Sequence, residues 1–197
     1  MSLRCEPSAV VPALPGIVAV AHHRQSNGLP TVYAVTAIRN TPTCRPASFR
    51  VQVPARPNGS TRWVDARAFR VLWVDTRIVI HVQSMRLELV RGGHVVLRSR
   101  IAPGAPETPT PLGHFYVTER LIPRDPNGPW GPAALGTSAF SPVLKNWVEG
   151  GPIGIHGTNE PWAIGHAASH GCIRLPNAMM KRLFAEVPAG TPIVIRR

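Results

Sequence analysis

Proline and glycine are the feature of this sequence that most restricts its fold. The chain has 22 prolines and 17 glycines among 197 residues, and they divide it into short segments. Such spacing leaves little room for long helices and favours short strands joined by turns. The hydrophobic content of 44% is enough for a buried core. We therefore predict a mainly β protein.

The spacing of strands and turns suggests three parts. Residues 1–29 mix apolar pieces with proline and glycine, and we expect a loosely ordered arm or one added strand. Residues 30–75 hold short strand-like runs, with Asn58-Gly59 favouring a hairpin, and predict a small β-barrel-like subdomain. Residues 76–197 form the remaining domain.

This last domain begins with an antiparallel meander and ends with a helix and a strand. The runs at 77–82, 86–90 and 94–101 alternate between apolar and polar residues, as half-buried strands do. Asn177 is a plausible N-cap for a short helix, since apolar residues recur after it at helical spacing. A final strand is expected at 191–195.

The segment 122–151 is rich in proline, glycine and tryptophan and predicts a long irregular loop. Loops of this length inside a compact domain are usually lids or binding loops. Trp130, Phe140 and Trp147 supply apolar area that would order such a loop. We expect a lid, with a poorly ordered insertion as the alternative.

The formal net charge of +12 comes almost entirely from arginine. Such a balance favours contact with polyanions, whether nucleic acid, an anionic membrane face or an acidic cell-wall polymer, and does not choose among them. The arginines are scattered singly, without the aromatic-interleaved basic motifs of nucleic-acid modules, so we expect no nucleic-acid partner. No apolar run is long enough for an integral membrane segment, because the run at 10–21 is short and broken by Pro12 and Pro15.

Three cysteines are present, Cys5, Cys44 and Cys172, without the C-x-x-C spacing of zinc ribbons and dithiol redox sites. Cys5 and Cys44 would be able to pair if the protein is exported. The N-terminal segment resembles a signal peptide poorly, and we expect that the true N-terminus is missing.

The stretch 155–177 carries the residues best suited to chemistry. Cys172 follows His170 and Gly171, and His156 precedes them. A thiol nucleophile needs a base within reach and backbone amides to hold an oxyanion. Taken alone, this set fits thiol catalysis and a buried structural cysteine equally well.

A zinc site is the other reading of the same stretch. His166, His170, Cys172 and His156 are all metal-ligating residue types. The flanking glycines and the lack of helical periodicity argue against the helix that the His166–His170 spacing would need. We expect no metal and no other cofactor, with His166 as a solvated loop residue.

The motif around Cys172 resembles the signature of the YkuD family of L,D-transpeptidases over residues 76–197. The match consists of His156-Gly157-Thr158 followed by Ser169-His170-Gly171-Cys172-Ile173-Arg174-Leu175 and Asn177. Two upstream elements are also similar to family elements, the TPxGxF element at 109–115 and the mobile cap at 128–131. The resemblance implies a β-sandwich with one or two short helices.

The resemblance also implies the chemistry of each residue. Cys172 would attack the L-centre carbonyl of diaminopimelate in a peptidoglycan tetrapeptide stem, release D-alanine and form a thioester. His156 would be the base, oriented by the Gly157 carbonyl, and the backbone of His170, Gly171 and Cys172 would stabilise the oxyanion. An amine from a neighbouring stem would then form a 3-3 crosslink.

Substrate contacts are expected from Arg174, Ser169, Thr158, Asn177 and Trp130, with Arg174 as an ion-pair residue as the alternative. The expected partners are peptidoglycan stem peptides and the anionic cell wall, and the expected state is a monomer outside the cytoplasm, in the wall or periplasm. Two other functions stay open: an L,D-carboxypeptidase that uses water, and a non-catalytic wall-binding module.

Overall fold

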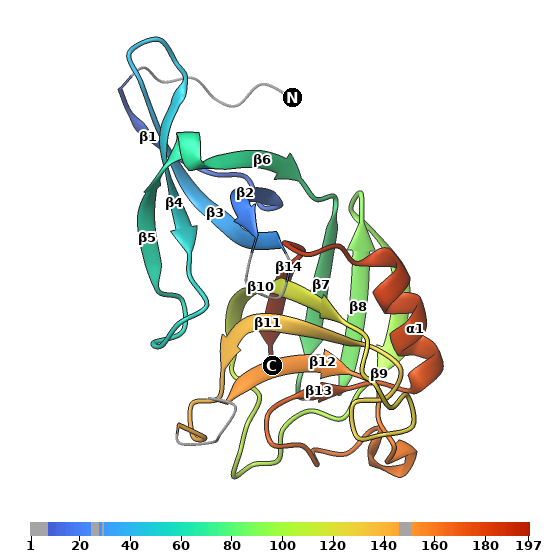
Figure 1. Ribbon diagram of the computed structural model, residues 1–197. Helices are drawn as coiled ribbons and strands as arrows, with labels where there is room; N and C mark the ends of the chain where they lie inside the picture. The colour runs from blue at the N-terminus through green and yellow to red at the C-terminus, as the bar shows by residue number, and fades with distance from the viewer. Residues whose placement is uncertain (1–7, 25–27, 29, 146–150) are drawn as a thin grey trace.

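A computed structural model describes residues 8–24, 28, 30–145 and 151–197. Figure 1 shows an N-terminal group of strands above a larger β unit that carries the single α-helix of the described chain. The prediction of a mainly β protein is confirmed. Cys5, which was expected to be able to pair with Cys44, and Trp147, which was expected to order the long loop, lie outside the described residues.

The N-terminal sheet begins earlier in the chain than the expected boundary at residue 29. Its strands are β1 (Val10–Pro12), β2 (Ile17–Arg24), β3 (Pro30–Asn40), β4 (Pro46–Gln52), β5 (Thr61–Asp65) and β6 (Phe69–Trp73). They follow the order β5-β4-β3-β2-β6, with β1 paired to β3. In the described residues no ladder joins β5 to β6, so the path is open where a barrel would close. Phe49 and Val51 lie in its core.

The larger sheet has eight strands in the order β13-β12-β11-β10-β14-β7-β8-β9. The strands are β7 (Thr76–His81), β8 (Arg86–Arg91), β9 (His94–Arg100), β10 (Gly113–Leu121), β11 (Ala134–Phe140), β12 (Pro152–His156), β13 (Ile173–Arg174) and β14 (Pro192–Arg196). β7, β8 and β9 form the predicted antiparallel meander.

The larger sheet folds over at β10. Residues 113–116 of β10 pair with β14, whereas the pairing with β11 starts at Val117 and shifts register before Glu119. The two halves therefore face each other and share one core, to which Ile80 and Leu89 contribute from one side and Leu135 and Ile155 from the other. This arrangement is the expected β-sandwich.

The helix α1 (Asn177–Glu186) covers part of this core. Met180, Leu183 and Val187 are buried, as the predicted apolar face requires. The predicted N-cap is wrong by one residue, because Pro176 occupies the cap position and Asn177 is the first helical residue. Asn177 Oδ1 instead accepts a hydrogen bond from the Thr158 amide, 2.8 Å away.

The expected irregular lid at 122–151 contains a strand. β11 lies between β10 and β12, and five of its residues, all except Gly136 and Phe140, are buried, with Leu135 completely inaccessible. Because the strand is covered on both faces, its sequence shows no alternation. The lid interpretation is wrong for this strand, whereas Trp130, which precedes it, lines the site described below.

Candidate active site

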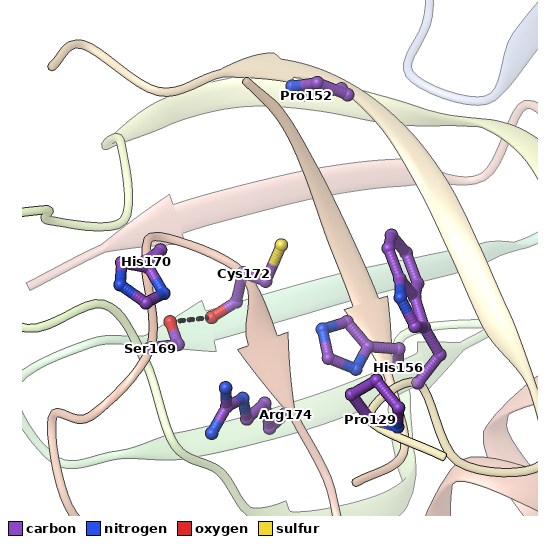
Figure 2. Close-up of a pocket in the computed structure, with 8 residues that line it drawn as sticks. Pro129, Pro152, His156, Ser169, His170, Cys172 and Arg174 are labelled. Atoms are coloured by element: carbon purple, nitrogen blue, oxygen red, sulfur yellow. Dashed lines mark hydrogen bonds between the residues drawn. The ribbon is translucent and has the colours of Figure 1, made fainter. Parts of the chain in front are cut away.

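A cleft of about 240 Å³ opens at the β12–β13 side of the sandwich. Its lining residues are Pro129, Trp130, Pro152, His156, Ser169, His170, Cys172 and Arg174. Figure 2 shows Cys172 with His170 on one side and His156 on the other. Six of the ten predicted site residues therefore share one cleft. Gly157, Gly171, Thr158 and Asn177 do not belong to its lining.

The parallel pairing of β12 with β13 brings the two halves of the motif together. His156 is the register partner of Arg174, and Ile155 is the partner of Ile173. Cys172, one residue before β13, is thereby level with Gly154, whose amide donates a hydrogen bond to the Cys172 sulfur at 3.4 Å. A donor aimed at the sulfur favours the thiolate over the thiol. Sequence reasoning missed this role of Gly154.

His156 is held in one orientation by its neighbour. Its Nδ1 lies 2.6 Å from the Gly157 carbonyl oxygen, as expected for an orienting contact. A carbonyl only accepts, so Nδ1 carries the proton and Nε2 of the neutral ring is left as a base. Burial lowers the pKa of His156 from 6.5 to about 4, opposed by the Gly157 bond and assisted by the charge of Arg174.

Trp130 packs on the imidazole and restricts it further. The two ring centroids are 5.0 Å apart, with an interplanar angle of 37°. The next residue, Gly131, has φ of +63°, and a Cβ there would lie 2.5 Å from Asn177 Oδ1 and 2.7 Å from the Thr158 amide nitrogen. The loop that carries Trp130 therefore approaches the His156 segment closely because Gly131 has no side chain.

Ser169 acts within the loop that presents Cys172. Its hydroxyl donates to the Cys172 carbonyl at 2.5 Å and accepts from the Gly171 amide at 3.1 Å (Figure 2 shows the first bond). The Gly171 amide, expected at the oxyanion, is therefore engaged inside the loop. Gly171 has φ of +111°, which L side chains rarely adopt, so its observed role is conformational. Ser169 holds the Cys172 carbonyl and also lines the cleft, and its expected substrate contact stays a prediction.

Two threonines support the same loop: Thr110, within the 109–115 element, and Thr108, just before it. Thr110 Oγ1 donates to the Gly171 carbonyl at 2.9 Å and accepts from the Gly104 amide at 2.9 Å. Thr108 Oγ1 donates to the Ser169 carbonyl at 3.1 Å. The sequence pattern placed this element upstream of the site but assigned no task to either hydroxyl. Both hydroxyls fix the backbone on which Cys172 is carried.

Arg174 lines the cleft and forms an ion pair at its edge. Its Nη1 donates to Glu160 Oε2 at 2.5 Å, so the ion-pair alternative is met. Its Nε is buried and has no hydrogen-bond partner among the described residues. A buried donor without a partner is rare in a folded protein. Arg174 therefore forms an ion pair with Glu160 while its Nε donor has no partner among the described residues.

The remaining predicted residues lie behind the cleft. Thr158 is buried; its amide bonds to Asn177 and its hydroxyl accepts from the Glu160 amide at 2.9 Å. Thr158 and Asn177 are thus joined by an internal hydrogen bond, and their expected substrate contacts stay predictions. His166 is exposed, as expected of a loop histidine. In the described part of the chain, no group of three or more His, Cys, Asp or Glu residues is arranged to hold a metal ion.

The fold and the cleft together define a class of protein: a curled β-sandwich whose cleft pairs a cysteine with an oriented, neutral histidine, as acyl transfer through a thioester requires. Residues 75–195 match the YkuD family, described as the L,D-transpeptidase catalytic domain. This match covers more than half of the chain, and the chain belongs to that family. It is an enzyme that acts on peptidoglycan.

Named relatives agree with this assignment. A protein of Bacillus subtilis (strain 168) that carries the name L,D-transpeptidase YkuD is 37% identical over 124 residues, which cover 63% of this chain and 68% of the relative. A Salmonella typhimurium protein named as a probable L,D-transpeptidase, ErfK/SrfK, is 34% identical over 159 residues. This match covers 70% of our chain but only 50% of that relative.

A solved structure supports the fold. An L,D-transpeptidase from Mycobacterium smegmatis superposes with a TM-score of 0.51 at 14% identity, covering 96% of this chain and 82% of that one. At this identity the similarity concerns architecture alone. No helix in the described ranges is long and apolar enough to cross a membrane.

Proposed function

We propose that the protein is a peptidoglycan L,D-transpeptidase with Cys172 as its nucleophile. The thiolate attacks the carbonyl of the L-centre of diaminopimelate in a tetrapeptide stem. The bond from that carbonyl to the terminal D-alanine breaks, and a thioester forms on Cys172. An amine of a neighbouring stem then attacks the thioester, which gives a 3-3 crosslink and returns the thiol.

One observation carries this proposal: His156 and Cys172 face the same cleft, and His156 is locked through Nδ1 with its Nε2 left as a base. Nε2 takes the thiol proton and later delivers a proton to the leaving amine. Because burial keeps the pKa of His156 low, at about 4, the imidazole is neutral at neutral pH and its Nε2 carries no proton. The backbone amides of His170, Gly171 and Cys172 are the proposed oxyanion donors, and the Gly171 amide also donates to Ser169 Oγ.

Arg174 is the proposed contact for a substrate carboxylate. Arg174 lines the cleft, and a guanidinium binds carboxylates through charge-assisted, often bidentate hydrogen bonds. The ion pair with Glu160 fixes the plane of the guanidinium in advance. Trp130 offers an apolar wall to the stem peptide.

We propose that the protein acts in the cell wall or periplasm, where stem peptides and the anionic wall are found. The net charge of +12 suits that anionic surface. We also propose that the protein acts as a monomer.

The test is incubation with a tetrapeptide stem, with and without an acceptor amine, followed by mass spectrometry of the products. We expect release of D-alanine and a crosslinked product that requires both the acceptor and Cys172. Release of D-alanine at the same rate without acceptor, and no crosslink with it, would establish the carboxypeptidase instead. Binding without any release, equal in Cys172→Ala, would establish the wall-binding module.

A further inference from the structure

The tip of the β4–β5 hairpin contacts the catalytic unit at the end of β11. Asn58 Nδ2 donates to the Phe140 carbonyl at 2.8 Å, and the Phe140 amide donates to Asn58 Oδ1 at 2.9 Å. The side-chain amide thus pairs with both backbone groups of one residue, as a neighbouring strand would. In Figure 1 the hairpin descends from the N-terminal sheet on the side where β11 turns back into β12.

Arg56 extends the same contact. Its Nη1 donates to the Ser141 carbonyl at 2.6 Å and its Nη2 to the Leu144 carbonyl at 3.0 Å. Its guanidinium carbon lies 5.0 Å from the centroid of the Phe140 ring. A Cβ added to Gly151 would lie 2.9 Å from Nη2, so the guanidinium also packs against the chain where it enters β12. Two hairpin side chains therefore hold both ends of the β11–β12 connection.

The contacted backbone leads directly to the cleft. Phe140 is the register partner of Pro152, and the Ser141 amide donates to the Gly151 carbonyl at 2.8 Å. Pro152 lines the cleft, and Gly154, two residues further, donates to the Cys172 sulfur. Only the first residues of β12 therefore separate the hairpin contact from Gly154, whose amide contacts the Cys172 sulfur.

This part of β12 needs support from outside its own ladder. The pairing of β11 with β12 shifts register between Gly136 and Phe140, so the regular ladder is interrupted there. Within the interruption, Thr137 Oγ1 donates to the Ile153 carbonyl at 2.6 Å. The hairpin contacts supply additional bonds at the point where the strand is held least by its neighbour.

We propose that Asn58 and Arg56 are positioning residues for the cysteine site: they fix the start of β12 so that the Gly154 amide faces the Cys172 sulfur. The inference rests on the proposed role of Cys172 as nucleophile. It assigns the N-terminal sheet a task in the reaction, which is to hold one wall of the cleft through the β4–β5 hairpin.

The experiment compares the wild type with Asn58→Ala, Arg56→Ala and the double variant in the full chain. Two properties are measured: the carbapenem acylation rate at saturation, separated from the apparent affinity, and the alkylation rate of Cys172 by iodoacetamide against pH. We expect the double variant to be acylated ~10-fold more slowly at saturation, because small displacements of reacting groups are costly. The midpoint of its alkylation profile is expected to move to higher pH, because the thiolate loses a donor. Arg56→Lys should recover part of both losses.

Two controls separate positioning from general loosening. Arg62→Ala removes an exposed arginine of the same hairpin, which donates a hydrogen bond to the carbonyl of its neighbour Thr61. Gln52→Ala removes a bond between the N-terminal sheet and β10, from Gln52 Nε2 to the His114 carbonyl at 2.9 Å. Both should keep the wild-type alkylation profile, even where thermal stability falls. The proposal is overturned if the double variant keeps the wild-type rate and profile, or if either control reproduces its profile shift. A wild type that reacts with iodoacetamide but with no carbapenem would contradict the proposed function, whereas the profile comparison would still judge the positioning role.

Discussion

His156 Nδ1 lies 2.6 Å from the Gly157 carbonyl oxygen, and this contact decides which ring nitrogen serves the cleft. No carboxylate takes the third position of a triad here; a backbone carbonyl does. Burial lowers the pKa of His156, and the hydrogen bond to the Gly157 carbonyl opposes this only in part, so the ring stays neutral.

Removing the base should abolish most of the reaction. We expect His156→Gln to lower the rate of Cys172 acylation at pH 7 by at least ~100-fold, which is the usual contribution of general acid–base catalysis. His166→Gln, in an exposed loop of the same stretch, is the matched control and should react like the wild type. Equal rates for the two variants, measured by stopped-flow or quenched mass spectrometry, would contradict the assignment of the base.

His156 should also make stability depend on pH. Its pKa is 6.5 in an unfolded chain and about 4 in the fold, so the unfolded state binds the proton more readily. The contribution to stability is fully present above pH 6.5 and is lost as pH falls through about 4, by at most ~3 kcal/mol. Urea unfolding at pH 7, 5 and 4 should show a steeper loss for the wild type than for His156→Gln. Parallel curves would refute this origin of the acid sensitivity.

Thr110 is expected to stabilise the loop that carries Cys172. Thr110→Val keeps the shape of the side chain but leaves the Gly171 carbonyl and the Gly104 amide without their buried partner. The expected cost in unfolding free energy is about 1–3 kcal/mol, with slower acylation. Thr108→Val removes one part-buried bond to Ser169 and should cost less. Urea denaturation measures the loss of unfolding free energy in both variants. A larger loss for Thr108→Val than for Thr110→Val would contradict the hydrogen-bond network described.

Gly131 tests how closely the Trp130 loop must approach the His156 segment. A Cβ at Gly131 would lie 2.7 Å from Gly157 Cα, so Gly131→Ala should displace that segment and slow acylation. Gly93→Ala is the matched control, because φ there is also positive, at +87°, but nothing lies within 4 Å of the added Cβ. Both variants should lose ~1–2 kcal/mol of stability, because a residue with a Cβ is strained at positive φ. Only Gly131→Ala should lose further stability and slow acylation. Equal losses would show that the close approach is unimportant.

The sequence predicted most of the larger sheet, because its strands alternate between core and solvent. The run at 86–90 is an example, with Leu87 and Leu89 buried and their neighbours more exposed. β11 was not predictable in this way, since small residues such as Ala134 and Ser138 are buried on both faces and lack strand propensity. β2 lies in the stretch expected to be a loose arm or one added strand, and it is an inner strand that pairs with both β3 and β6.

The site also has a part that the sequence predicts and a part that depends on the tertiary structure. Cys172 and His156 could be identified from local motifs, which fix residue types and spacing. The Gly154 amide at the sulfur, the Trp130 stacking and the Ser169 bonds depend on the β12–β13 register and on loop geometry. Asn177 shows the limit: its position suggested a helix cap, but a backbone donor from Thr158 competes for the same oxygen.

The most direct test of the account is the intact mass of the protein after incubation with a carbapenem, compared with Cys172→Ala. We expect a covalent adduct of one carbapenem on the wild type, located on Cys172 by peptide mapping, and none on the variant. A wild type that stays unmodified, or an adduct that persists in Cys172→Ala, would contradict Cys172 as the nucleophile.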